Sequence, residues 1–144
     1  MSGEGDKESI DAVTKAFFGV FSNRDGGCPN LSALYELFVP GGLILKTCGD
    51  AVTVYSLPEF IEPRARLFSE GGLREFSEEE SAERTDVFGS VAQRFCSYRK
   101  SGVLDGERFE AKGMKCLQFV KSSGRWLLSS VAWDDERDGN LVSM

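Results

Sequence analysis

The sequence predicts an α+β domain, a cone-shaped fold in which three N-terminal helices pack on a curved antiparallel sheet, with a small hairpin inserted before the third helix. Apolar residues recur at steps of three and four over residues 9–21, which is typical of a helix. From residue 73 onward the pattern changes to alternation, which is typical of strands, and Gly89, Gly106 and Gly124 fall at or near their connections. Helices gathered on one face of such a sheet leave a cone between the layers, so we also expect a cavity there.

The first two helices and the hairpin follow from local signals. Residues 9–21 form the first helix, which Ser9 is expected to cap. After the turn-forming stretch SNRDGGCPN, Asn30 or Ser32 can cap a short second helix that Pro40-Gly41 stops. The runs LILKTC and AVTVY around Gly49-Asp50 are rich in β-branched and apolar residues, which favours a short hairpin.

The third helix begins at Ser56-Leu57-Pro58-Glu59, which is a capping box with proline in the first turn. Its face of Phe60, Arg64, Leu67 and Phe68 places a guanidinium on the side that should be buried. Pro63 either bends this helix or divides it into two short turns, and Gly71-Gly72 ends it.

Four strands are expected near residues 74–87, 90–100, 108–121 and 125–134. The last connection, Ser122-Ser123-Gly124, fits a three-residue hairpin turn. That turn pairs Lys121 with Arg125, and therefore Leu117 with Ser129 and Lys115 with Val131. By alternation, Lys115, Leu117 and Phe119 share a face with Leu127, Ser129, Val131 and Trp133.

The totals fit one domain of residues 1–144, with an ordered core of about 9–137 and polar, mobile tails of roughly 1–8 and 138–144. No apolar run approaches the ~18 residues needed to cross a membrane. The start MSGEGDKES lacks the features of a secretory signal, so we expect a cytoplasmic chain whose cysteines are reduced and buried.

Charge and residue types exclude several functions. The net charge of −6 and the lack of a basic track argue against a nucleic-acid partner. The chain contains no histidine, which excludes Ser/His and Cys/His catalysis and a histidine-ligated metal. Four cysteines without a CxxC pair are wrongly spaced for a local zinc site, so we expect neither a metal nor a cofactor.

Six segments together resemble a known superfamily: LFVPGGLI, SLPEFIEPR, GGLREFSEEE, VFGSVAQRFCSYR, GMKCLQFV and RWLLSSVAWDDER. Over residues 9–137 the chain resembles the nuclear transport factor 2-like, or SnoaL-like, superfamily, which includes ketosteroid isomerase and polyketide cyclases. The segments resemble most an uncharacterised bacterial branch. The resemblance implies a homodimer formed across the sheet and a pocket in the cone.

Two departures limit what the resemblance implies. Lys115 stands after Gly113-Met114 where similar proteins have asparagine, so ligand preference is expected to differ. The aspartate and tyrosine of ketosteroid isomerase have no matching motif, so that activity is not carried over. Because pockets in similar folds favour the face of Trp133, we assign Lys115 and Trp133 to the cone and Trp126 to the dimer side.

The candidate site lies at a polar end of the cone. A buried charge needs a partner, so Arg64 is predicted to pair with Glu80 or Glu78. This pair either fixes a helix to the sheet or helps to line the pocket. Lys115 either reaches the rim or pairs inside, and Arg94 is either exposed or paired with an acid of the first long strand. Asp134 and Asp135 point to opposite faces and begin an exit into solvent with Arg137. The predicted ligand-binding set is Tyr55, Arg64, Glu78, Glu80, Cys96, Tyr98, Lys115, Leu117, Val131 and Trp133.

The predicted function is binding, or enzymatic processing, of a small and partly apolar molecule in the cone. Chemistry would be cofactor-independent isomerase, cyclase or dehydratase work, with Glu80 as base and Tyr98 or Lys115 stabilising negative charge. The alternatives are a noncatalytic dimeric module and, with less support, a protein-binding role.

Overall fold

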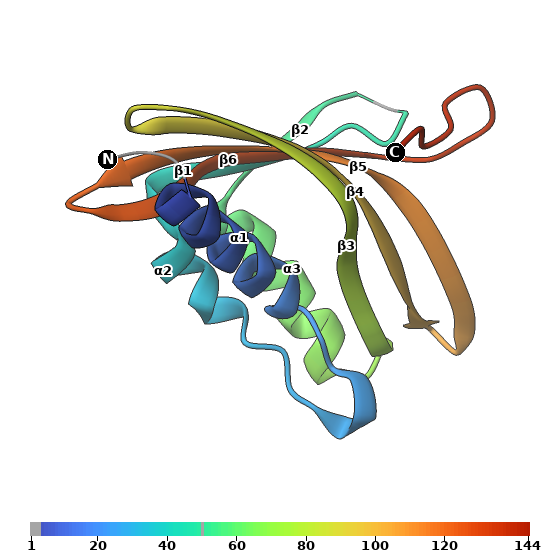
Figure 1. Cartoon of the computed structure of the whole chain (residues 1–144). Coiled ribbons are helices and arrows are strands. Elements are labelled where there is room, and N and C mark those ends of the chain that lie inside the picture. Colours follow the sequence, from blue (N-terminus) through green and yellow to red (C-terminus); the bar gives the residue numbers. More distant parts are fainter. Residues whose placement is uncertain (1–3, 50) are drawn as a thin grey trace.

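Three helices lie against one face of a six-stranded sheet, and the long strands bend around them (Figure 1). The computed structural model describes residues 4–49 and 51–144. Its helices are α1 Glu4–Gly19, α2 Leu34–Leu37 and α3 Leu57–Ser69, with 3-10 turns at Arg24–Gly26 and Leu31–Ala33. Its strands are β1 Phe38–Lys46, β2 Thr53–Ser56, β3 Leu73–Phe88, β4 Val91–Leu104, β5 Glu107–Ser122 and β6 Arg125–Asp135. The predicted class and order of elements are confirmed.

The sheet has the order β2-β1-β6-β5-β4-β3. The hairpin of β1 and β2 joins it because β1 runs parallel to β6, with Lys46 beside Trp133. The sheet is therefore mixed and not wholly antiparallel as predicted. Asp50, at the expected tip of that hairpin, lies outside the described residues, as do residues 1–3. None of the described helices is long and apolar enough to span a membrane.

Helix α1 begins earlier than the sequence predicts. Residues 4–8 are helical and not part of a mobile tail, so Ser9 lies inside the helix and does not cap it. Asp6 explains the early start, because its buried carboxylate accepts hydrogen bonds from Trp126 Nε1 at 3.0 Å and Lys121 Nζ at 3.1 Å. Trp126 therefore faces the helices, and its assignment to the dimer side is wrong.

The second and third helices show how local signals hold or fail. The Ser56–Glu59 capping box is formed, and α3 continues through Pro63 as one helix. Helix α2 is only four residues long, since Phe38 already begins β1 and Pro40 lies inside that strand.

The expectation that the cysteines are buried is wrong for three of the four. All four are free, but only Cys96 is buried, and Cys28 and Cys116 are exposed.

The register of β5 and β6 differs from the prediction. The turn has two residues, Ser123 and Gly124, both with positive φ (51° and 79°), so Ser122 pairs with Arg125. A second shift between Gln118 and Phe119 then places Lys115 opposite Trp133 and Leu117 opposite Val131. This bulge turns Leu128 toward the helices on the same face as Val131. The predicted pairings with Arg125, Ser129 and Val131 are therefore wrong.

Strands β3 and β4 contain a similar irregularity. Their turn pairs Phe88 with Val91, and a shift between Glu80 and Ala82 moves the register by one residue. Glu80 therefore lies opposite Tyr98. From the sequence alone, a three-residue turn closed by Gly89 would give the same pairing, but the structure reaches it through a two-residue turn followed by a bulge.

Candidate functional site

A cavity of about 440 Å³ lies between the helices and the concave face of the sheet. Phenylalanines of α1 and α3 form one wall, and Trp133 of β6 lies on the opposite wall. Phe60 joins the two, because its ring meets Trp133 edge-on at a centroid distance of 6.1 Å. The apolar lining is Phe17, Phe21, Ile44, Phe60, Pro63, Leu67, Phe68, Leu73, Phe76, Leu104, Phe109, Val131 and Trp133. Its charged lining is Lys46, Arg64, Glu78, Lys100 and Lys115.

Lys115 and Glu78 form a buried ion pair at this cavity. Nζ of Lys115 lies 3.2 Å from Oε2 of Glu78, and the two side chains are only 6% and 7% exposed. Lys115 lies on β5 and Glu78 on β3, so the amine crosses over β4 and passes 4.4 Å from the ring centroid of Tyr98. The ring of Trp133 lies 5.0 Å from the same nitrogen. The aromatic faces and the carboxylate together offset the desolvation of the amine. Of the two alternatives for Lys115, pairing inside the cone is therefore the one observed.

Tyr98 does not point its hydroxyl into the cavity. The hydroxyl donates a hydrogen bond to the Asp135 carboxylate and lies 3.3 Å from the Asp134 carbonyl. Gly113 makes this possible, because a Cβ there would collide with the hydroxyl. Burial, together with the hydrogen bond to Asp135, raises the pKa of Tyr98.

Asp135 is a polar centre that the sequence reasoning missed. Besides Tyr98, it contacts Lys100 Nζ at 3.1 Å and Cys48 Sγ at 3.5 Å. Burial would raise the pKa of Asp135, but the Tyr98 hydrogen bond and the Lys100 charge outweigh it, and the pKa is lowered. The expected association with Arg137 holds for Asp134, which pairs with it at 2.6 Å, whereas the Asp135 carboxylate binds Tyr98 and Lys100; the two aspartates are equally exposed, at 33% and 34%. Alternation from Trp133 was the signal that places Asp135 on the concave face.

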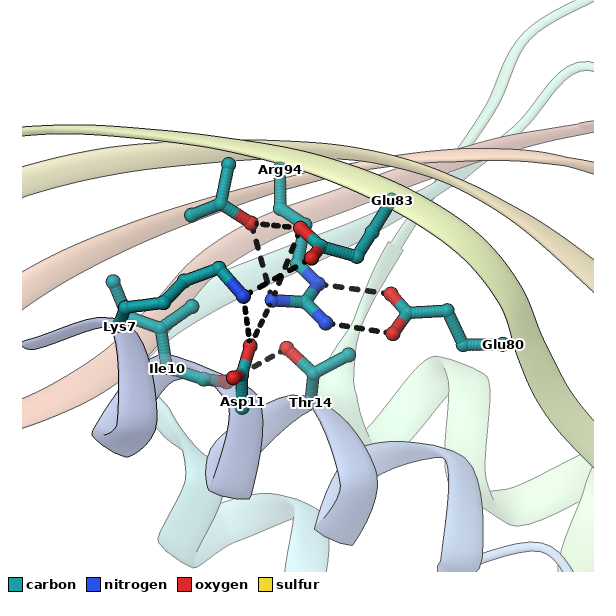
Figure 2. A network of polar contacts seen from close by, with 8 residues as sticks. Lys7, Ile10, Asp11, Thr14, Glu80, Glu83 and Arg94 are labelled. Atoms are coloured by element: carbon teal, nitrogen blue, oxygen red, sulfur yellow. Dashed lines mark hydrogen bonds and ion pairs between the residues drawn. The ribbon is translucent and has the colours of Figure 1, made fainter. Parts of the chain in front are cut away.

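Arg94 forms the centre of a second charged network, between α1 and the sheet (Figure 2). Its guanidinium binds both carboxylate oxygens of Glu80, at 2.6 and 2.8 Å, and Asp11 of α1 at 2.6 Å. Lys7 bridges Asp11 and Glu83 at 2.8 and 3.0 Å. Burial would lower the pKa of Arg94, but Glu80 and Asp11 outweigh it and raise the pKa. Of the two alternatives for Arg94, exposure or pairing with an acid of the first long strand, pairing is the one observed.

Arg64 has different neighbours from those predicted. Its guanidinium carbon lies 3.7 Å from the ring centroid of Phe60 and 5.4 Å from that of Tyr55. One nitrogen donates to the Phe60 carbonyl at 3.1 Å. Within residues 4–49 and 51–144 it makes no ion pair, so the predicted pair with Glu80 or Glu78 is wrong. The two glutamates are instead bound by Arg94 and Lys115.

The structure thus divides the predicted residue set. Five members line the cavity: Arg64, Glu78, Lys115, Val131 and Trp133. Cys96, Tyr98 and Leu117 are buried in the wall behind it, Tyr55 packs on Phe60, and Glu80 belongs to the Arg94 network. Lys46 and Lys100 line the cavity but were not predicted. In the described part of the chain, no group of three or more cysteines and carboxylates is placed to hold a metal ion.

Comparison with known proteins identifies the fold. No protein-family model and no curated protein matches the sequence. Among solved structures, a nuclear transport factor 2-like superfamily protein from Salmonella enterica is 14% identical, with a TM-score of 0.70 and 88% of each chain covered. A Novosphingobium aromaticivorans protein provisionally named an aromatic ring hydroxylase is 12% identical, with a TM-score of 0.74 and coverage of 93% of this chain and 91% of that one.

A third similar structure comes from Exiguobacterium sibiricum and is provisionally named a Ca/calmodulin-dependent kinase II association domain. It is 6% identical, with a TM-score of 0.72 and coverage of 95% of this chain and 98% of that one. At these identities the likeness concerns the fold alone. The chain therefore has the nuclear transport factor 2-like fold.

Proposed function

We propose that this chain, with its nuclear transport factor 2-like fold, binds a small and partly apolar molecule in the cavity. The observation that carries the proposal is the buried Lys115–Glu78 pair at the wall of a cavity of about 440 Å³ whose lining is mostly apolar. Ligand sites in proteins are typically of ~300–1,000 Å³, apolar, with a few placed polar groups. The name of the Novosphingobium protein refers to aromatic rings, which accords with such walls.

Within this proposal, we assign Glu78 the role of the base and Lys115 that of stabilising negative charge that develops on the bound molecule. Glu80 is less suitable than the sequence suggested, because Arg94 binds both of its oxygens. Tyr98 is also less suitable, since its hydroxyl is engaged by Asp135. The reaction class remains that of an isomerase, cyclase or dehydratase, with Glu78 in place of Glu80 as the base.

The test is a thermal-shift and native mass spectrometry screen of lipidic, polyketide-like and aromatic acids. The informative variant is Lys115→Met/Glu78→Met, because replacing both partners leaves no unpaired buried charge and is often tolerated. Lys112→Met, an exposed lysine on the same strand, is the matched control. We expect compounds that stabilise the wild type and Lys112→Met but not the double variant. Equal stabilisation of all three proteins, or of none, contradicts the proposal.

A second proposal concerns self-association through the convex face of the sheet. Phe95 is 39% exposed there, beside the exposed Cys116 on the neighbouring strand. Aromatic side chains are enriched in protein–protein interfaces. The name of the Exiguobacterium protein, an association domain, is in keeping with this proposal. Sedimentation should give a dimer for the wild type and for Arg66→Glu on α3, and a monomer for Phe95→Glu. A monomeric wild type contradicts it.

A further inference from the structure

The charges that line the cavity do not balance. Lys46, Arg64, Lys100 and Lys115 line it, against a single carboxylate, Glu78. Lys115 is paired with Glu78, and Lys100 with Asp135 in the wall. Within the described residues, Lys46 and Arg64 have no carboxylate partner. The chain as a whole carries a net charge of −6, so this excess of cations is local to the cavity.

Arg64 shows how incomplete this arrangement is. The residue is half-buried, and among the described residues its one hydrogen-bond acceptor at close range is the Phe60 carbonyl, at 3.1 Å. A guanidinium carries five N–H donors in a planar fork, so donors remain that a bound molecule can engage. Burial lowers the pKa of Arg64, and the influence of Tyr55 and of the Glu78 charge offsets it only in part. Stacking on Phe60 fixes its plane without neutralising it.

Lys46 belongs to the same end of the cavity. It lies on β1 beside Trp133 of β6, and the Trp133 ring contacts Phe60, on which Arg64 stacks. The aromatic pair of Phe60 and Trp133 therefore connects two cation-bearing residues of the lining, Arg64 of α3 and Lys46 of β1. This end of the cavity thus combines aromatic surface with unpaired positive charge.

We propose that the ligand is an anion, a carboxylate attached to an aromatic or aliphatic body, and that Arg64 and Lys46 bind its carboxylate. This inference rests on the proposed function, and it adds the chemical class of the ligand. A planar guanidinium matches a carboxylate through two parallel hydrogen bonds, and a lysine adds a point charge. The body of the ligand then lies along Phe68, Phe76 and Phe109, away from the charged end.

The test compares acids with their neutral amides of the same shape. Isothermal titration calorimetry measures the Kd of 2-naphthoate, octanoate and the two corresponding amides for the wild type, Arg64→Gln, Lys46→Gln and Arg66→Gln. Arg66 is an exposed arginine on the same helix and serves as the control. We expect at least one acid to bind the wild type about ten- to a hundredfold more tightly than its amide, as charged hydrogen bonds do.

The variants separate charge from shape. Arg64→Gln should remove most of this preference, Lys46→Gln part of it, and Arg66→Gln none, with a much larger loss of affinity for the acids than for the amides. Raising the NaCl concentration should weaken the binding of the acids to the wild type and leave the binding of the amides unchanged. This measurement tests the charge of the ligand even if Arg64→Gln does not fold. Amides that bind as tightly as the acids overturn this inference and leave the proposed function standing. Failure of all four compounds to bind overturns both.

Discussion

Replacing Arg94 by methionine should destabilise the protein more than replacing any other charged residue of β4. Arg94 is 3% exposed, and its guanidinium joins Glu80 of β3 to Asp11 of α1 (Figure 2). Methionine fills a similar volume but leaves these carboxylates, and Glu83 beside them, without their main cation. The helix and the sheet would then repel each other at a position where they now attract.

The magnitude follows from the burial of the partners. Breaking a buried ion pair by removing one member costs about 3–5 kcal/mol, because the other charge stays buried and unpaired. Here the carboxylates of Glu80, Glu83 and Asp11 keep 20%, 26% and 44% of their side-chain surface exposed, so water can partly solvate them. Lys7 also remains bound to two of them. We therefore expect the lower end of the range, about 3 kcal/mol.

The assay is urea unfolding at pH 7, followed by circular dichroism and by tryptophan fluorescence. Arg99→Met is the matched control, since Arg99 is an exposed arginine on the same strand, and it should change the free energy of unfolding by less than about 0.5 kcal/mol. Arg94→Met/Glu80→Met should recover part of the loss. A loss below about 1 kcal/mol for Arg94→Met refutes the view that this network fastens α1 to the sheet.

Two further changes test the wall behind the cavity. Tyr98→Phe should cost about 1 kcal/mol of stability at pH 7, because the hydrogen bond to Asp135 is lost. Folding lowers the pKa of Asp135 below its ordinary value of 3.8, so this stabilisation is present above that value and disappears as the pH falls through the folded pKa. Urea unfolding at pH 7 and about pH 3 should therefore show a smaller difference between wild type and variant at the lower pH, and an unchanged difference contradicts the prediction. Gly113→Ala should cost about 2 kcal/mol, since its Cβ would collide with the Tyr98 hydroxyl and the Asp134 carbonyl, whereas Gly5→Ala in α1 meets no atom and should be neutral or stabilising; equal melting temperatures for the two variants contradict it.

Signals that act between near neighbours in the chain were enough to predict most elements. The capping box at Ser56 and the alternation after residue 73 are each recognised from residues that are close together in the chain. The early start of α1 is different in kind, because Asp6 is held by Trp126, which is 120 residues away in the sequence. The parallel contact of β1 with β6 is equally remote from any local signal.

The prediction of the candidate site was limited by the register of the strands. Strict alternation correctly placed Lys115 and Trp133 on one face, since they pair with each other and no register shift separates them. It failed for Trp126, which lies on the far side of that bulge and faces the helices. A bulge adds one residue to one strand and reverses the face of every side chain beyond it. Because both faces of this strand carry apolar side chains, the sequence does not show which face is buried on either side of the bulge.

The bulge in β3 has the larger consequence, because it sets the charge of the cavity. Unbroken alternation from Glu78 and Glu80 would bring Arg84 to the concave face, whereas the shift before Ala82 brings Glu83 there and turns Arg84 toward Phe95 on the convex face. Arg94 thus meets Glu80 and Glu83 together, and Glu80 is no longer free to reach Arg64. Lys115 pairs with Glu78, and Lys100 pairs with Asp135. Once these four carboxylates are bound within the sheet, Arg64 and Lys46 are the cations of the cavity lining without a carboxylate partner among residues 4–49 and 51–144, and a ligand can supply that counter-charge.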